Sequence, residues 1–582
     1  MALINTALRC LIAALFAVCC ATTSVAQNSA AEKMPIIDYR ERFLPVVASE
    51  GMVVGPERLA SEIGIDMLRR GGNAVDAAVA TGLALAVSYP RAGNLGGGGF
   101  MLIHLAEENR QTLIDYREMA PAAATADLFV GEDGKVNRMQ EFFSHAAAGV
   151  PGTVAGMLMA LERYGTLPLG TVIAPAIALA ENGLEVSFAL NFEIDQRAAR
   201  LKKNAEAARL LLDESGAAPA IGSRFRQPDL AKTLKRIAAR GSAGFYHGEV
   251  AELIVQEMER GGGLITAADL ADYRALEREP VRGTFRGYEI VATPPPSSGG
   301  IHIIQMLNIL EGYDLASLGH NSAAYLHLLI ESMKLAYADR SQYLGDPDFV
   351  DVPQAQLTDK DYAARLRETI GERARPSTEI SPGRNMPGES SDTTHYTVAD
   401  SQGNFVSNTY TLNFSFGSHI AVPGTGIMLN NEMADFAAEP GKANAYGLVQ
   451  GESNAIAPRK RPLSSMTPTL VLKDGQPWLA TGSPGGSVNI TTVLQTLLNA
   501  MEFDMNIAAA AAAPRLHHQW LPDRVRAERG FSPDTLRLLE AMGHDVEIGQ
   551  RSLGRTHSIM RERDRLYGAT DTRRPGGWVA AY

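Results

Sequence analysis

A break in the sequence pattern before residue 393 constrains the fold of this chain more than any other feature. Residues 371–392 show no apolar periodicity and are rich in proline, glycine and serine, which predicts an exposed, mobile linker. The segment Thr393–Val398 (TTHYTV) is then rich in β-forming residues, and a second strand is predicted at Phe405–Asn413 after a turn at residues 400–404. A long polar linker therefore leads directly into a β-hairpin, whose turn is expected to place Thr393 opposite residues near Tyr410 and Thr411.

Elsewhere the patterns predict a chain of mixed helices and β-hairpins. The region from about residue 150 to 380 carries mostly helical periodicity, and no internal repeat is visible. Capping residues, apolar periodicity and turn dipeptides mark helices at residues 57–70, 74–87, 489–501, 508–513 and 532–543, and hairpins at residues 100–116 and 469–481.

Composition bounds the class of protein. The 582 residues are 45% hydrophobic and 20% charged, which is ordinary for a globular enzyme and unlike a disordered chain. A chain of this length can bury one or two substantial cores. The formal net charge of −11 argues against nucleic-acid binding, which requires a basic patch. We therefore expect no nucleic-acid partner.

The N-terminus has the pattern of a secretory signal peptide. Arg9 precedes an apolar run, Cys10–Cys20, and small residues follow up to Ala26, after which we expect cleavage. The alternative of a membrane anchor is disfavoured, because a spanning helix needs roughly 20 apolar residues. A lipid anchor on Cys19 or Cys20 is a weaker alternative, since the residues before them do not suit it. Residues 1–26 are thus predicted to be removed, leaving no membrane anchor.

All three cysteines lie inside that segment, so the mature protein contains none. This excludes a disulfide scaffold, a thiolate zinc site and cysteine catalysis. A cysteine-free exported enzyme suits the bacterial periplasm, where we expect this protein to reside.

Several familiar sites are absent from the sequence. It contains no H-E-x-x-H, G-x-S-x-G or G-x-x-x-x-G-K-[ST] motif. The glycine run Gly96–Gly99 lacks the lysine and the spacing of a phosphate-binding loop, and close backbone packing is the better interpretation. His517 and His518 have no metal-ligand spacing, which favours structural roles. We expect neither a cofactor nor a metal.

The hairpin gives Thr393 a chemical possibility. Two threonines that open a strand indicate only β-propensity, but here a linker precedes them. If the chain is cut between Asp392 and Thr393, Thr393 gains a free α-amine beside its own hydroxyl. The pKa of an α-amine lies near 7.7–8.0, whereas that of a lysine lies near 10.4, so this amine can act as the base for the hydroxyl.

Other polar residues have the chemistry to complete such a site. Carboxylates follow an apolar strand near residue 432, and two glycines end a strand before a helix, where free N–H groups favour an oxyanion. Each alone is more often a turn or cap residue, and sequence spacing does not bring them together. The candidates are Thr411, Asn413, Glu432, Asp435, Ser464, Ser465, Gly485 and Gly486.

Along nearly the whole mature chain the sequence resembles the γ-glutamyltranspeptidases, which are N-terminal nucleophile hydrolases. Many long motifs occur in the same order, which makes the resemblance highly specific. They are Asn94–Leu102 (NLGGGGFML), Asp115–Pro121 (DYREMAP), Gly149–Gly156 (GVPGTVAG), Pro294–Gly300 (PPPSSGG), Thr393–Tyr396 (TTHY), Thr409–Asn413 (TYTLN), Arg461–Met466 (RPLSSM) and Gly482–Ser487 (GSPGGS).

The resemblance implies an α+β fold, a four-layer αββα sandwich, and a precursor that cuts itself before Thr393. The large chain, residues 27–392, and the small chain, residues 393–582, are expected to stay associated. The implied activity is cleavage of the γ-glutamyl bond of glutathione and related γ-glutamyl compounds. It proceeds through an ester on Thr393 that passes to water or to an amino-acid or dipeptide acceptor.

The resemblance also implies two groups of site residues. One group forms and stabilises the acyl intermediate, and the other grips the amino-acid end of the substrate. The first consists of Thr393 as nucleophile, Thr411 in its activation, and Gly485 and Gly486 as the oxyanion hole; in the second, Arg117, Ser464 and Ser465 hold the α-carboxylate, and Asn413, Glu432 and Asp435 hold the α-ammonium. These charges match the substrate, although Arg117 alone would also suit a structural ion pair.

One position departs from the family pattern. The family usually has an acid where this chain has Ala434, but Asp435 beside it occupies the functional position. The stretch Phe436–Tyr446 resembles a loop that covers the site in many members, with Tyr446 as its covering residue. It favours the peptidase over relatives that take bulkier acyl groups. Two alternatives remain: an acylase of the same fold acting on cephalosporin-type side chains, and a non-enzymatic periplasmic binding protein.

Overall fold

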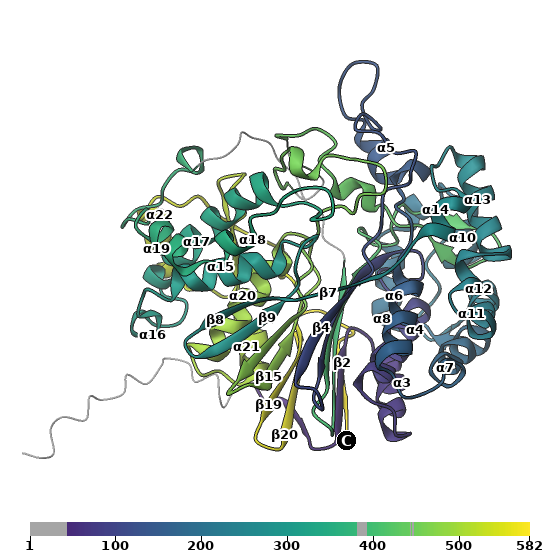
Figure 1. Cartoon of the computed structure of the whole chain (residues 1–582), viewed down its shortest axis with the longest axis horizontal. Coiled ribbons are helices and arrows are strands. Elements are labelled where there is room, and N and C mark those ends of the chain that lie inside the picture. The colour runs from purple at the N-terminus through teal and green to yellow at the C-terminus, as the bar shows by residue number, and fades with distance from the viewer. Residues whose placement is uncertain (1–42, 381–392, 443, 445–446) are drawn as a thin grey trace, which may run out of the picture. The chain divides into compact units, whose positions relative to one another are not determined.

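Two seven-stranded sheets lie face to face at the centre of the computed structural model, which describes residues 43–380, 393–442, 444 and 447–582 (Figure 1). The first sheet has the order β21 (Trp578–Ala581), β2 (Gly51–Gly55), β10 (Thr394–Asp400), β11 (Phe405–Thr411), β3 (Gly98–Leu105), β4 (Arg110–Asp115) and β7 (Leu276–Arg278). The second has the order β1 (Val46–Ala48), β20 (Arg565–Thr570), β19 (His557–Glu562), β15 (Gln476–Thr481), β14 (Thr469–Lys473), β9 (Tyr288–Ala292) and β8 (Val281–Phe285).

Helices cover the outer face of each sheet (Figure 1). Beside the first sheet lie α3 (Arg58–Arg69), α4 (Ala74–Ser88), α6 (Thr153–Tyr164), α7 (Leu169–Asn182) and α11 (Pro228–Arg240). On the side of the second sheet lie α15 (Gly299–Leu310), α17 (Ala323–Tyr343), α19 (Lys360–Arg367), α20 (Val488–Met501) and α21 (Ile507–Ala512). The arrangement confirms the predicted four-layer αββα sandwich.

Side-chain alternation along the strands divides the interior between the layers. On β2, Met52 and Val54 belong to the core between the two sheets, whereas Val53 packs into the core beneath the helices. Such a period of two is what a strand buried on both faces requires. Helix α4 is buried along its whole length, as its all-round apolar sequence predicts, and Asn73 caps it in a capping box with Asp76.

The remaining helices and strands complete the fold. Among the described residues they are α5 (Arg138–Phe143), η1 (His145–Ala147), β5 (Leu184–Glu185), α8 (Phe188–Asp195), α9 (Ala198–Leu201), α10 (Ala205–Leu211), β6 (Arg224–Phe225), α12 (Ala243–Tyr246), α13 (Glu249–Gly261), α14 (Ala267–Asp272), α16 (Leu315–Leu318), α18 (Gln354–Leu357), η2 (Ser377–Glu379), β12 (Ala421–Val422), β13 (Ile427–Met428), η3 (Glu432–Asp435), η4 (Glu452–Asn454), β16 (Leu516–His517), β17 (Val525–Ala527), α22 (Pro533–Ala541) and β18 (Val546–Ile548). No helix in the described part of the chain is both long and apolar enough to span a membrane.

The predicted hairpins are confirmed with small shifts in their ends. Strand β10 pairs antiparallel with β11, and Thr394 lies opposite Tyr410, so Thr393 falls beside Thr411 as predicted. The hairpin at Asp474 is formed by β14 and β15. Helices α3, α4, α20, α21 and α22 occupy the predicted segments.

The sequence predicted an exposed linker from residue 371 onward, and this prediction is wrong for residues 377 and 380. Ser377 and Ile380 are buried, and the indole Nε1 of Trp520 donates to their carbonyl oxygens at 2.9 and 3.2 Å. The backbone N–H of Ser377 also donates to Asp523 Oδ2 at 2.8 Å. Polar composition misled the prediction, because these bonds come from residues more than a hundred positions away. Residues 381–392 lie outside the described residues, as does the predicted signal peptide.

The glycine run packs closely against backbone, as expected. A Cβ atom added to Gly97 would lie 1.9 Å from the carbonyl oxygen of Thr411, so only glycine fits there. The structural interpretation of His517 is confirmed as well: the ring is buried and hydrogen-bonded to Thr491 Oγ1 at 2.8 Å and Gln519 Oε1 at 2.9 Å.

Candidate active site

A small cavity of about 20 Å³ lies beside Thr393. Its volume is enough for about one water molecule. It collects most of the site residues predicted from the sequence. Its lining consists of Arg117, Arg340, Thr393, Thr411, Glu432, Asp435, Asn444, Leu448, Leu463, Ser464, Ser465, Met466, Gly486 and Asn489. Asn413 and Gly485 are sequence neighbours of this lining, and Tyr446 lies outside the described residues.

Thr393 stands immediately before β10, with 5% of its surface exposed. Its Oγ1 lies 3.5 Å from Thr411 Oγ1, at the end of the partner strand. The Thr411 oxygen already accepts the backbone N–H of Asn413 at 2.8 Å, which leaves its own hydroxyl hydrogen to donate to Thr393. Thr411 can therefore orient Thr393 Oγ1 while the Thr393 hydroxyl loses its proton.

The position of Thr411 is fixed from the neighbouring loop. Asn94 Nδ2 donates to the Thr411 carbonyl oxygen at 2.9 Å. Asn94 Oδ1 in turn accepts the Gly97 backbone N–H at 2.9 Å and the Thr153 hydroxyl at 2.8 Å. The NLGGGGFML motif thus acts as a support for the residue that contacts Thr393.

Gly485 and Gly486 form the turn between β15 and α20. Their φ angles are 141° and 55°, which strongly favour glycine. Within the described part of the chain neither N–H has a hydrogen-bond acceptor. Gly486 lines the cavity beside Thr393. Unpaired N–H groups next to a nucleophile are what an oxyanion hole requires.

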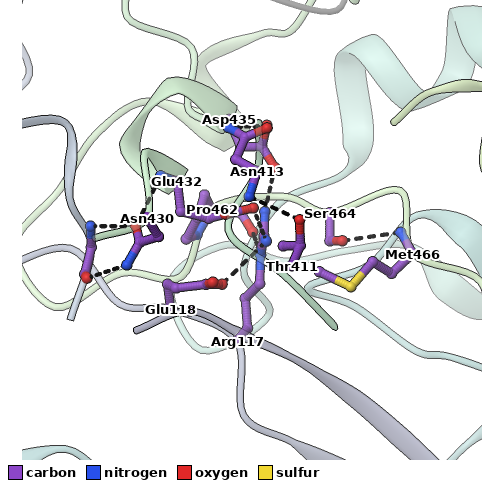
Figure 2. Close-up of polar contacts among 12 residues, drawn as sticks. Arg117, Glu118, Thr411, Asn413, Asn430, Glu432, Asp435, Pro462, Ser464 and Met466 are labelled. Atoms are coloured by element: carbon purple, nitrogen blue, oxygen red, sulfur yellow. Dashed lines mark hydrogen bonds and ion pairs between the residues drawn. The ribbon is translucent and has the colours of Figure 1, made fainter. Parts of the chain in front are cut away.

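Arg117 forms a buried ion-pair cluster at the floor of the site (Figure 2). Its guanidinium donates to Glu432 and to Asp435, to Glu118 Oε2 at 3.2 Å and to the carbonyl oxygen of Pro462 at 3.2 Å. In Figure 2, Glu118 and Glu432 lie on one side of Arg117 and Ser464 on the other. Arg117 thus makes the ion pairs that the sequence left open as its structural role.

The cluster holds three carboxylates against one guanidinium. Burial favours a lower pKa for Arg117, but Glu432, Asp435 and Glu118 outweigh it and raise that pKa. Burial raises the pKa of Glu118 to about 7 and that of Glu432 well above its usual range, in both cases against the pull of Arg117. The cluster consequently has room for a further positive charge.

Asn413 offers an acceptor beside these acids. Its Nδ2 donates to the carbonyl oxygen of Asn431 at 3.0 Å and contacts Asp435 Oδ1 at 3.4 Å. Its Oδ1 is buried and has no hydrogen-bond donor among the described residues. An amide oxygen and two carboxylates around one point suit an ammonium group, which carries three N–H donors.

Ser464 and Ser465 are held in place by the PPPSSGG segment. The backbone N–H and the hydroxyl of Ser298 both donate to the Ser464 carbonyl oxygen at 2.9 Å. The Ser464 N–H donates to the carbonyl oxygen of Pro296 at 2.7 Å. Two motifs that lie far apart in the sequence thus form one wall of the cavity.

Sequence reasoning missed two charged residues of the site. Glu118 belongs to the DYREMAP motif, and its position next to Arg117 was the available signal. Arg340 lies in the last turn of α17, a helix buried along most of its length, and lines the cavity. No local pattern marked it, because its contact with Ser465 spans 125 positions of the chain.

One group of described side chains has the composition of a metal site. His327, Glu331 and His544 are buried and bring one possible ligand atom each to within 4.8 Å of one another. Several of their polar atoms have partners: His327 bonds His544 at 2.8 Å and the Gly371 carbonyl oxygen at 2.8 Å, and Glu331 forms an ion pair with Lys334 at 2.6 Å. The cluster does not line the Thr393 cavity, and Lys334 supplies its cation.

Comparison with known proteins gives one consistent result. The model of the family described as Gamma-glutamyltranspeptidase matches residues 60–581. The chain is 51% identical over 559 residues to the glutathione hydrolase proenzyme of Escherichia coli strain K12, covering 95% of this chain and 96% of that protein. It is 41% identical over 554 residues to the acylase ACY 1 proenzyme of Pseudomonas sp. strain SE83, covering 94% and 96%.

Solved structures agree with this result. A cephalosporin acylase from Bacillus halodurans superimposes with a TM-score of 0.83 at 30% identity, covering 95% of this chain and 98% of that one. A γ-glutamyltranspeptidase from Helicobacter pylori gives a TM-score of 0.55 at 46% identity, covering 57% of this chain and 96% of that one.

Proposed function

This chain belongs to the γ-glutamyltranspeptidase family, and we propose that it acts through Thr393 as the N-terminal residue of a small chain. Its activity is hydrolysis and transfer of γ-glutamyl groups, and it is made as a precursor, as its relatives named glutathione hydrolase proenzymes are. A non-enzymatic binding protein is thereby excluded. We propose glutathione and related γ-glutamyl compounds as donors, and water, amino acids or dipeptides as acceptors.

The single observation that carries the assignment is the position of Thr393 Oγ1, between the Thr411 hydroxyl and a cavity lined by Gly486. In the proposed reaction the Thr393 amine takes the hydroxyl proton, and Oγ1 attacks the γ-carbonyl carbon. The N–H groups of Gly485 and Gly486 stabilise the oxyanion. The amine proton then passes to the departing amine, the C–N bond breaks, and a γ-glutamyl ester remains on Thr393.

The ester is resolved by the reverse sequence. The Thr393 amine takes a proton from a water molecule or from the amine of an acceptor, which attacks the ester carbonyl carbon. The C–Oγ1 bond breaks and the proton returns to Oγ1. The products are glutamate or a new γ-glutamyl amide, together with free Thr393.

We propose that the Arg117 cluster recognises the amino-acid end of the donor. That end is a zwitterion, so it carries the same two charges that pair within the cluster. Its ammonium can replace the guanidinium of Arg117 at Asp435 and Glu432. The same ammonium can also donate to Asn413 Oδ1, which has no donor among the described residues. Its carboxylate can then bind Arg117 and the hydroxyls of Ser464 and Ser465. Recognition thus exchanges ion pairs and leaves no charge unpaired.

Maturation is proposed to use the same nucleophile. Thr393 Oγ1 attacks the carbonyl carbon of Asp392, the peptide C–N bond breaks, and the nitrogen takes a proton to become the α-amine. Water then hydrolyses the ester, which gives the carboxylate of Asp392 and the free hydroxyl of Thr393. The Helicobacter pylori chain supports such a division, because somewhat more than half of this chain accounts for nearly all of it.

The two chains, residues 27–392 and 393–582, are proposed to stay together because their strands interleave. In the first sheet β10 and β11 of the small chain lie between β2 and β3 of the large one. In the second sheet β20, β19, β15 and β14 lie between β1 and β9. Separation would therefore expose the hydrogen-bonding edges of strands in both sheets. We also propose that residues 1–26 direct the protein to the periplasm, in keeping with the absence of cysteine from the rest of the chain.

The similarity to acylases makes the donor the point to test. We expect γ-glutamyl-p-nitroanilide to be cleaved far better than glutaryl-p-nitroanilide, which lacks only the α-amine. The reason is that Asp435, Glu432 and Asn413 have no partner in the glutaryl group equivalent to the ammonium. A preference for the glutaryl compound would instead place the chain with the acylases.

A further inference from the structure

Arg340 is a buried guanidinium without a carboxylate partner in the described part of the chain. It is 2% exposed and lines the same cavity as Thr393 and Ser465. Its Nε donates to Ser298 Oγ at 3.0 Å and its Nη2 to Ser465 Oγ at 3.2 Å. Its Nη1 is buried and has no hydrogen-bond partner among the described residues. No carboxylate oxygen of those residues lies within 4.0 Å of the group.

A charge in such surroundings is costly unless an anion compensates it. Burial lowers the pKa of Arg340 to about 10, partly offset by Tyr337 and Asp435, so the group is still charged at neutral pH. Two other buried arginines of this protein do have such partners: Arg515 pairs with Asp571 at 3.0 Å, and Arg461 with Asp115 at 2.9 Å. Arg340 differs from them in facing a cavity that a ligand can enter.

The Arg117 cluster, which lines another part of the same cavity, explains what that ligand should carry beside Arg340. Arg117 is surrounded by Glu118, Glu432 and Asp435, so the charge on that side does not exceed zero even with two of the acids protonated. A carboxylate that reached Arg117 alone would meet these acids. The positive charge available to it without competition comes from Arg340, beside the hydroxyl of Ser465.

We propose that Arg340 is a substrate-binding residue whose free Nη1 holds the α-carboxylate of the γ-glutamyl group together with Ser465. The inference rests on the proposed function of the Thr393 site. In this arrangement Arg340 adds to the carboxylate contacts proposed for Arg117, Ser464 and Ser465: the acids around Arg117 take the ammonium, and Arg340 supplies the carboxylate with a second guanidinium. Ser298, which accepts Arg340 Nε, is the positioning residue that fixes the guanidinium.

Arg340→Met tests the proposal on the processed enzyme. The variant should fold, because it removes a buried charge and leaves no partner carboxylate unpaired. We measure inhibition constants for L-glutamate and for 4-aminobutyrate, which differ only in the α-carboxylate, with γ-glutamyl-p-nitroanilide as reporter. L-Glutamate should bind about 10- to 150-fold more weakly, the loss of one charge-assisted hydrogen bond. Binding of 4-aminobutyrate should change by less than about threefold.

Two further variants separate this role from a structural one. Ser298→Ala keeps the charge but loosens it, so glutamate should bind a few-fold more weakly and 4-aminobutyrate unchanged. Arg461→Lys alters a buried arginine that does not line the cavity, and any loss there should be equal for both ligands.

The outcomes are distinct. Equal weakening of both ligands by Arg340→Met, or no weakening of glutamate, overturns the role of Arg340 while the proposed function stands. A wild-type enzyme that does not cleave γ-glutamyl-p-nitroanilide overturns the proposed function itself.

Discussion

Asp435→Asn probes the recognition of the substrate ammonium with a change of one atom. The carboxylate lies at the edge of the cavity, with 12% of its side chain exposed, and accepts Arg117 Nη2 and Asn413 Nδ2. In the variant Arg117 keeps Glu432 and Glu118, so the fold of the cluster should persist. The ammonium of the donor, in contrast, loses one of its two carboxylates.

The expected loss in kcat/KM follows from that geometry. The loss of a charge-assisted hydrogen bond costs roughly 1.5–3 kcal/mol, which is about 10- to 150-fold in kcat/KM. Because the side chain is mostly buried, solvent screens the interaction little. Glu432 and Asn413 Oδ1 remain as acceptors, which favours the lower half of that range. A donor without an α-amine has no such contact to lose.

The assay compares kcat/KM for γ-glutamyl-p-nitroanilide and glutaryl-p-nitroanilide in the wild type and the variant. We expect a loss of about 10- to 40-fold on the first and less than about threefold on the second. The variant should still be processed, since maturation requires no substrate. An equal loss on both donors would refute the reasoning and assign Asp435 to the fold of the site.

Three further perturbations test other parts of the account. If the Thr393 amine is the base, kcat/KM should rise with pH with an apparent pKa within about one unit of 7.7–8.0, and a flat profile from about pH 6 to 9 would count against it. Burial, opposed by Arg138, raises the pKa of Glu141 to about 7. The contribution of Glu141 to stability is therefore present below its unfolded pKa near 4.3 and is lost as pH rises through about 7. The Tm of Glu141→Gln should consequently rise relative to that of the wild type between about pH 5 and 8, and a Tm difference that stays constant with pH would contradict this. Gly97→Ala should destabilise the protein by about 1–3 kcal/mol and lower kcat at least about tenfold, because the new methyl group meets the carbonyl oxygen of Thr411, whereas Gly170→Ala, with no atom nearby, should do neither.

Local sequence pattern was sufficient to predict the main hairpins and several helices, and to place Thr393 beside Thr411. The hairpin register that places Thr393 beside Thr411 follows from strand length and turn position alone, and the structure has it. The sequence also predicted that Gly96–Gly99 packs against backbone, because the run lacks the lysine and the spacing of a phosphate-binding loop. Such features depend on a few consecutive residues, which a sequence displays directly.

The electrostatic part of the site was beyond sequence spacing. Arg117 meets Glu432 across 315 positions and Asp435 across 318, because loops from different layers converge on one cavity. Family resemblance named these residues but gave no indication that they pair with one another. Arg340 and the anchored segment around Ser377 escaped prediction for the same reason, since their partners are fixed only by tertiary structure.

The central claim is that Thr393 both cuts the chain and becomes the nucleophile. Its most direct test is N-terminal sequencing of the smaller band of purified wild-type protein, beside a denaturing gel of Thr393→Ala. We expect the small chain to begin Thr393-Thr394-His395-Tyr396 and the Thr393→Ala variant to remain one inactive chain. A small chain that begins at another residue, or a Thr393→Ala variant that still splits at the same bond, would contradict it.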